Sequence, residues 1–219
     1  MSAFDNETYE LLVRAAAVSE EYPRHFDPAT QYGQAIIEIK NDVETVTTQQ
    51  ASLKESERRK KLATEARGAA RTDLRSYMET ASRIARGLKE AVFERPRSRK
   101  DGTLVGIARM WAQHAAPKKQ LFIDSGLKDF PEGLTDRAAA ASQAIAEQEA
   151  AKNEYQALQA AIEATLTHAF SAYKRLAPMM AYVLRDDPPA LAVWEQACHV
   201  EKRSVQKPPE TENSPTAAA

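Results

Sequence analysis

The side chains best suited to chemistry gather in the segment DPPALAVWEQACHVEKR (187–203). Glu195, Cys198 and His199 fall within about one and a half turns of an expected helix, and the i, i+4 spacing of Glu195 and His199 would let both reach one metal ion. A structural zinc ion needs four protein ligands and a catalytic one about three, but no further Cys or His follows at a usual spacing. The pattern therefore favours a helix that packs Trp194 and Cys198 against a larger helical body.

The same segment is similar to the C-terminal ending of uncharacterised bacterial helical-bundle proteins. The matching positions are Pro189, Ala190, Leu191, Trp194, Ala197, His199, Val200 and Glu201. The resemblance covers RDDPPALAVWEQACHVEK (185–202), which is less than a tenth of the chain. It implies a bacterial origin and a recurring way of closing a helical bundle, and it implies no activity.

Other catalytic and metal-binding patterns are not found in the sequence. A di-iron bundle needs Glu three residues before a ligating His on two helices. The residues at that position before the four histidines are Tyr22, Trp111, Thr165 and Gln196. There is no G-x-S-x-G nucleophile motif and no phosphate-binding GxxxxGK[ST] loop. We therefore predict a non-enzymatic protein with no catalytic residue, no metal ligand and no cofactor.

Composition narrows the class of protein and its location. The 219 residues contain one cysteine, so an intrachain disulfide is excluded. The first residues lack the pattern of a signal peptide, and no run reaches the roughly 18 apolar residues that cross a bilayer. We expect a cytoplasmic protein that does not bind membranes.

Apolar residues at alternating steps of three and four predict an all-α fold. A first helix is expected up to about Tyr22, a very long one over 29–95, whose continuity near 49–57 stays open, and a short one around Trp111. Another long helix is expected from Thr135, as its cap, to the break at Asp187. The expected core positions on the two long helices are Ile36, Ile39, Val43, Leu74, Ile145, Tyr155, Ile162 and Tyr173.

These helices predict an elongated antiparallel helical hairpin, or up-down bundle, with short covering helices. Two long helices joined by a connector of about forty residues run back along each other, and their many alanines permit close approach. We expect one helical-bundle domain over 1–205 and a disordered tail over 206–219, where apolar periodicity is absent.

Charge is strongly segregated along the chain. Residues 1–53 carry nine acidic and three basic side chains, whereas 54–100 carry fifteen basic and seven acidic ones. The candidate polyanion-binding residues are Arg58, Arg59, Lys60, Lys61, Arg67, Arg71, Arg75, Arg95, Arg97, Arg99 and Lys100. Arg83 and Arg86 lie among them, and the 67–71–75 series forms a ridge at i, i+4 and i+8. Such a ridge could follow phosphates, or it could be a solvated face partly paired with the acidic N-terminal third.

Two functions follow from these patterns. The first is a structural or interaction module that contacts a protein partner or a second copy of itself, because two long helices with few covering elements leave apolar surface exposed. The alternative is nucleic-acid or other polyanion binding through the basic segment 54–100.

Overall fold

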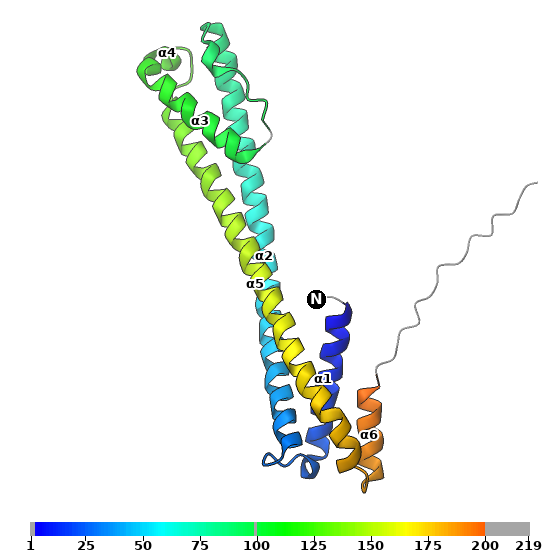
Figure 1. The fold of residues 1–219 in the computed structure, drawn as a ribbon. Helices are drawn as coiled ribbons and strands as arrows, with labels where there is room; N and C mark the ends of the chain where they lie inside the picture. The colour runs from blue at the N-terminus through cyan, green and yellow to red at the C-terminus, as the bar shows by residue number, and fades with distance from the viewer. Residues whose placement is uncertain (1–2, 99, 200–219) are drawn as a thin grey trace, which may run out of the picture. The chain divides into compact units, whose positions relative to one another are not determined.

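The computed structural model describes residues 3–98 and 100–199, and within these ranges every regular element is a helix (Figure 1). In chain order the elements are α1 (Ala3–Glu21), η1 (Pro23–His25), α2 (Gln31–Gly87), η2 (Ala91–Phe93), α3 (Asp101–Ala115), η3 (Ala116–Lys118), α4 (Lys119–Asp124), α5 (Glu132–Val183) and α6 (Pro188–Cys198). The all-α prediction is confirmed. Among the described helices, none combines the length and apolar composition that a bilayer crossing requires.

The chain divides into two compact units. Among the described residues, the terminal unit takes in 3–44 and 165–199, and the central unit takes in 45–98 and 100–164. Helices α2 and α5 contribute to both units. The single domain expected over 1–205 stays a prediction, and the tail expected over 206–219 lies outside the described residues.

In the terminal unit the start of α2 runs antiparallel to the end of α5. Asp42 bonds to Nδ1 of His168 at 2.6 Å, and Glu38, one turn earlier, pairs with Arg175, seven residues later. Helices α1 and α6 also pack on each other in this unit. Its core is mainly aliphatic, and the buried side chains include Leu12, Val18, Ile36, Ile39, Leu166, Leu176, Met180 and Leu184.

Helix α6 closes the terminal unit through Trp194, which is 3% exposed. The indole lies 6.4 Å from the ring of Phe26 and 6.4 Å from the ring of Tyr173, measured between centroids. The structure therefore confirms that this segment is a helix that packs Trp194 against a larger helical body.

Asp187 begins α6 and ties it to the turn after α1. Its carboxylate accepts from the backbone N–H of Ala190 and pairs with Arg24 and with Nε2 of His25, the latter at 2.8 Å. The hydrogen bonds from His25 and then from Arg24 lower the pKa of Asp187 to about 2. Asp187 therefore caps the beginning of α6, whereas the two prolines after it suggest from the sequence only that a helix ends here.

The central unit is the predicted antiparallel hairpin. Arg59 pairs with Glu154 at 3.5 Å, Thr64 accepts from Gln148 at 3.2 Å, and Asp73 pairs with Arg137 at 3.2 Å. As the residue number rises on α2 it falls on α5, so the two helices run in opposite directions.

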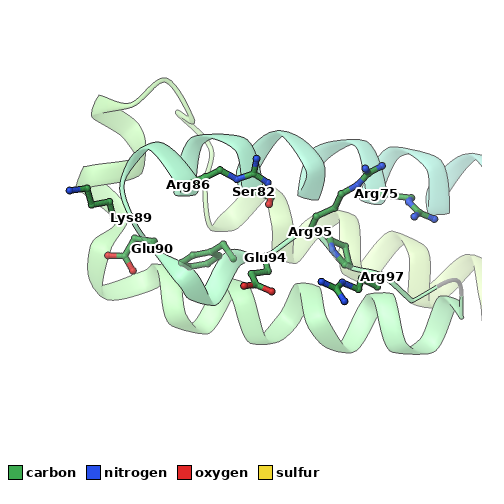
Figure 2. Close-up of a pocket in the computed structure, with 10 residues that line it drawn as sticks. Arg75, Ser82, Arg86, Lys89, Glu90, Glu94, Arg95 and Arg97 are labelled. Carbon is green, nitrogen blue, oxygen red and sulfur yellow. The ribbon is translucent and has the colours of Figure 1, made fainter.

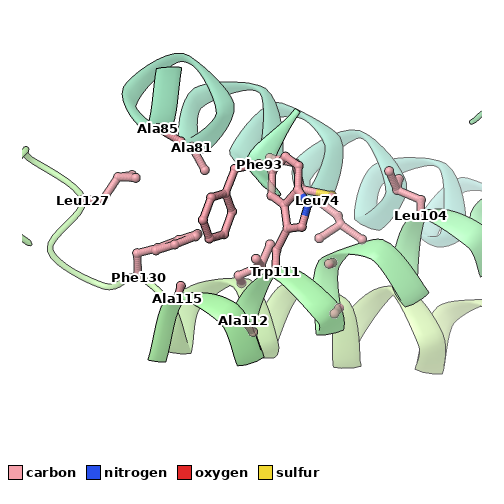
Figure 3. Packing of buried hydrophobic residues seen from close by; sticks show 14 of the residues in the cluster. Leu74, Ala81, Ala85, Phe93, Leu104, Trp111, Ala112, Ala115, Leu127 and Phe130 are labelled. Carbon is pink, nitrogen blue, oxygen red and sulfur yellow. The ribbon is translucent and has the colours of Figure 1, made fainter. Parts of the chain in front are cut away.

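An aromatic cluster covers one end of this hairpin. Phe93 stands at its centre, with ring centroids 5.4 Å from Trp111, 5.2 Å from Phe122 and 5.9 Å from Phe130 (Figure 3). The cluster takes further buried side chains from α2, α3 and α5, such as Leu74 and Leu134. α3 and α4 thus act as the covering helices that the sequence predicts for the hairpin (Figure 1).

Helix boundaries depart from the sequence prediction at three places. α2 is one helix through 49–57, but it ends at Gly87 instead of continuing to Arg95. Thr135 does not cap α5, because the helix already begins at Glu132 and the Thr135 hydroxyl donates to the carbonyl of Pro131. Helix α4 is not predicted from the sequence, because its six residues are too few to show a helical period.

Of the eight expected core positions, half are fully buried. These are Ile36, Ile39, Leu74 and Ile162. Val43, Ile145, Tyr155 and Tyr173 are only half-buried. Ile145 packs at the edge of the core cluster of the central unit, and the ring of Tyr155 lies against the ammonium group of Lys60.

Candidate anion-binding cleft

A left-handed residue ends α2 and turns the chain back along it. Lys89 has φ of 58°, its N–H donates to the carbonyl of Arg86 at 3.1 Å, and the N–H of Glu90 donates to the carbonyl of Ala85 at 2.9 Å. This pair of bonds is the Schellman arrangement, which satisfies the last carbonyls of a helix. Glycine usually occupies the left-handed position, so a lysine there conceals the helix end in the sequence.

Two contacts hold the returning segment against α2. The buried ring of Phe93 anchors its beginning in the aromatic cluster. Further along, the Arg95 guanidinium bonds to Oε1 of Glu79 at 2.7 Å and 3.1 Å, while Arg75 reaches the same oxygen at 3.4 Å. The hydrogen bonds from Arg95 and then from Arg75 lower the pKa of Glu79, so this carboxylate stays ionised at neutral pH and keeps both arginines in place.

Between α2 and this segment lies an open cleft of about 730 Å³. Its lining residues are Arg75, Ser82, Arg86, Lys89, Glu90, Phe93, Glu94, Arg95, Pro96 and Arg97. Figure 2 shows residues 75, 82 and 86 on α2, opposite residues 94, 95 and 97, with 89 and 90 at the turn. Five lining side chains are cationic and two are acidic, so the cleft is positively charged.

Three of the lining cations have no acidic partner. Whereas Arg75 and Arg95 share Glu79, no carboxylate among the described residues lies within ion-pair distance of Arg86, Lys89 or Arg97. The lining acid Glu90 is itself paired with Lys118 at 2.5 Å. The second lining acid, Glu94, offsets one of these three charges, so the cleft keeps a net positive charge that is available to a ligand.

The basic run 58–61 lies away from the cleft, and some of its side chains are paired with carboxylates. Arg58 donates to Glu55 at 3.0 Å and 3.1 Å, which lowers the pKa of that carboxyl group. Arg59 pairs with Glu55 and Glu154, and the ammonium group of Lys60 lies 3.6 Å from the ring centroid of Tyr155.

The predicted arginine ridge is divided by a shared carboxylate. Asp101, at the start of α3, binds Nε of Arg67 at 2.7 Å and Nε of Arg71 at 3.2 Å, and its side chain is only 9% exposed. Arg67 also donates to the side-chain oxygen of Gln148. Only Arg75, the third member of the ridge, reaches the cleft.

The acidic partners of the described basic segment come from within the central unit. For Arg58, Arg59, Arg67 and Arg95 these partners are not the acidic N-terminal residues that the sequence suggested. Lys61 and Lys100 are exposed on the same unit, and Arg99 lies outside the described residues. Of the candidate polyanion-binding residues, the structure brings Arg75, Arg95 and Arg97 together at the cleft.

Sequence reasoning missed Ser82 and Lys89 as members of the site. No motif marks either residue, because the cleft exists only where the chain turns back on α2. The position of the turn depends on the left-handed Lys89, for which the sequence offers no glycine. The sequence offers one indication of this turn. Apolar residues at helical spacing give way to the ERPRSRK segment (94–100), which has no such spacing.

The cluster near the C-terminal end has the geometry of packing. Glu195 and His199 are exposed, and Cys198 is half-buried beside Tyr173. Burial raises the pKa of the Cys198 thiol, which lowers the fraction of reactive thiolate at neutral pH. Among residues 3–98 and 100–199, no group of three or more His, Cys, Asp or Glu side chains is placed to hold a metal ion.

Comparisons with known proteins give no match, whether with family models, curated proteins or solved structures. The resemblance of 185–202 to bacterial helical-bundle proteins therefore stays a prediction.

Proposed function

We propose that this chain is a non-enzymatic interaction module, and that the paired helices of its central unit bind a second copy of the chain. The proposal rests on how few side chains are buried in the middle of the hairpin. Between residues 47 and 73 of α2 only Ser56 is buried, and between 145 and 161 of α5 the structure shows no buried residue.

The apolar groups needed for a helical interface are present on this stretch. Leu62 is 52% exposed, and Ala66 and Ala69 follow it at helical spacing on α2. On α5 the exposed alanines include Ala146, Ala150, Ala157 and Ala164. Small side chains let helix axes approach to about 8 Å, so another pair of helices can pack closely here.

Charge favours a second copy as the occupant. Residues 54–75 of α2 carry eight basic and four acidic side chains, while 147–163 of α5 carry four acidic and one basic. In a two-fold pair the same surface serves both partners. The basic helix of each copy then meets the acidic helix of the other, giving a four-helix arrangement that buries both half-covered seams.

Sedimentation equilibrium or light scattering over a range of protein concentrations tests this proposal. We expect the mass of two chains at about 50 mM salt and weaker association at higher salt, which screens exposed charge pairs. Leu62→Lys should return the protein to one chain, because it places an ammonium group in the apolar interface. Leu121→Lys is the matched control, since Leu121 is 42% exposed on α4, outside the stretch. A single-chain mass at all concentrations, or equal masses for both variants, would contradict the proposal.

A further inference from the structure

The cationic cleft between α2 and the 89–97 segment has features of a ligand site that self-association does not explain. Its volume of about 730 Å³ falls within the range that small-molecule sites occupy. Arg86, Lys89 and Arg97 converge on it without an acidic partner among the described residues. Like charges brought together in this way repel one another, and a bound anion would remove that cost.

A serine hydroxyl group on the cleft wall also has no hydrogen-bond partner among the described residues. Ser82 is 4% exposed and lines the cleft, yet no hydrogen-bond partner for its side chain is found among the described residues. Serine and threonine in a helix commonly donate to the carbonyl four residues earlier, as Thr72 and Thr80 do at 2.9 Å and 3.1 Å. Figure 2 shows the Ser82 oxygen on the side of α2 that faces the returning segment, so the hydroxyl is placed to donate to a ligand.

We propose that this cleft binds a small molecule through a diphosphate or similar oligophosphate group. A guanidinium group presents paired N–H donors that match phosphate oxygens, and the cleft offers two such groups, an ammonium group and a hydroxyl. Three unpaired cations suit a ligand that carries several negative charges better than one that carries a single carboxylate. The volume leaves room for an organic part beside the phosphates.

The surroundings favour a small ligand over a nucleic-acid strand. A strand needs a continuous series of unpaired cations along its backbone. On α2 that series is interrupted next to the cleft, because Asp101 already binds both Arg67 and Arg71. The unpaired cations of the cleft are therefore separated along α2 from the basic run 58–61.

Isothermal titration calorimetry with inorganic pyrophosphate tests the proposal directly. We expect saturable one-to-one binding that Arg86→Gln weakens by about tenfold or more, as loss of a charge-assisted bond requires. Ser82→Ala should weaken it by about fivefold, because one neutral donor is lost. Arg83→Gln is the matched control, because Arg83 is also exposed on α2 but does not line the cleft. The affinity of this variant for pyrophosphate should stay within about twofold of the wild-type affinity.

Two further measurements make the outcome decisive. Circular dichroism of each variant shows that it is folded, and Arg86→Lys, which keeps the charge, should recover part of the affinity. Duplex DNA is titrated separately at about 50 mM and 200 mM salt. The proposal is overturned if pyrophosphate gives no saturable binding at millimolar concentration. It is also overturned if Arg86→Gln and Arg83→Gln weaken binding equally, or if DNA binds more tightly than pyrophosphate and loses affinity equally in both variants. The result does not depend on self-association, since monomeric Leu62→Lys protein should bind pyrophosphate as the wild type does.

Discussion

Replacing Phe93 with leucine should destabilise the central unit far more than its size change suggests. The ring makes three edge-to-face contacts, with Trp111, Phe122 and Phe130, at interplanar angles of 73°, 72° and 66°. Each such contact contributes about 0.5–1.5 kcal/mol beyond the burial of apolar area. Because leucine retains most of the buried area and none of these contacts, we expect Phe93→Leu to lower the free energy of unfolding by about 3 kcal/mol.

Urea unfolding followed by tryptophan fluorescence measures this change. The two tryptophans lie in different units. Both proteins should therefore also carry Trp194→Phe, so that the fluorescence comes from Trp111 alone, which contacts residue 93. Phenylalanine at 194 keeps an aromatic side chain beside Phe26. The linear dependence on urea gives the free energy of unfolding, provided that the transition is two-state.

The neighbouring Val92 provides the control, because it is 45% exposed and lies one residue from Phe93. Val92→Ala should change the free energy of unfolding by less than about 0.5 kcal/mol, as surface substitutions usually do. If Phe93→Leu also changes the free energy of unfolding by less than about 0.5 kcal/mol, the aromatic cluster does not hold the returning segment against α2. The account of how the cleft is built would then be wrong.

Three other perturbations have outcomes that follow from single sites. Gly68→Ala should raise the free energy of unfolding by about 0.5–1 kcal/mol in a urea titration, because the helix favours alanine and a Cβ there meets nothing within 4 Å; an unchanged midpoint would contradict this. Asp187 has a pKa lowered to about 2 from 3.8, so its stabilising effect is complete above about pH 4 and is lost as the pH falls towards 2; thermal melting should show Asp187→Asn approaching wild type over that range, while Asp186→Asn, at a side chain 86% exposed, differs little at any pH. The hydrogen bond to Asp42 raises the pKa of His168 above 6.5, so its contribution is complete below about pH 6.5 and is lost as the pH rises through the raised value; a melting difference from His168→Gln that grows with pH would refute this assignment.

The helical pairing was predictable from the sequence because apolar spacing over dozens of residues carries a strong signal. Ile36, Leu74 and Ile162 are buried as their periodicity predicts. The end of α2 was not predictable to the same degree, since the apolar period continues past Gly87 to Val92. A left-handed lysine and a pair of backbone bonds decide that boundary, and neither is visible as a residue pattern.

The basic residues were recognised from composition, but their partners were not. Local pairs such as Glu55 with Arg58 follow from helical spacing. Asp101 meets Arg67 only because α3 folds back onto the hairpin, and a tertiary contact of this kind leaves no trace in a single sequence. The count of fifteen basic side chains in 54–100 therefore overstates the charge that a ligand meets.

The terminal unit is assembled from the two ends of the polypeptide, with the whole central unit inserted between them. Its ion pairs join residues far apart in sequence, such as Arg24 with Asp187. During synthesis every residue of the central unit has been made once residue 164 has been added, whereas α1 meets its packing partner α6 only after residue 198 has been added. The order of translation thus gives the two units different folding times, and the early helix is the part of the nascent chain with the longest need for protection from aggregation.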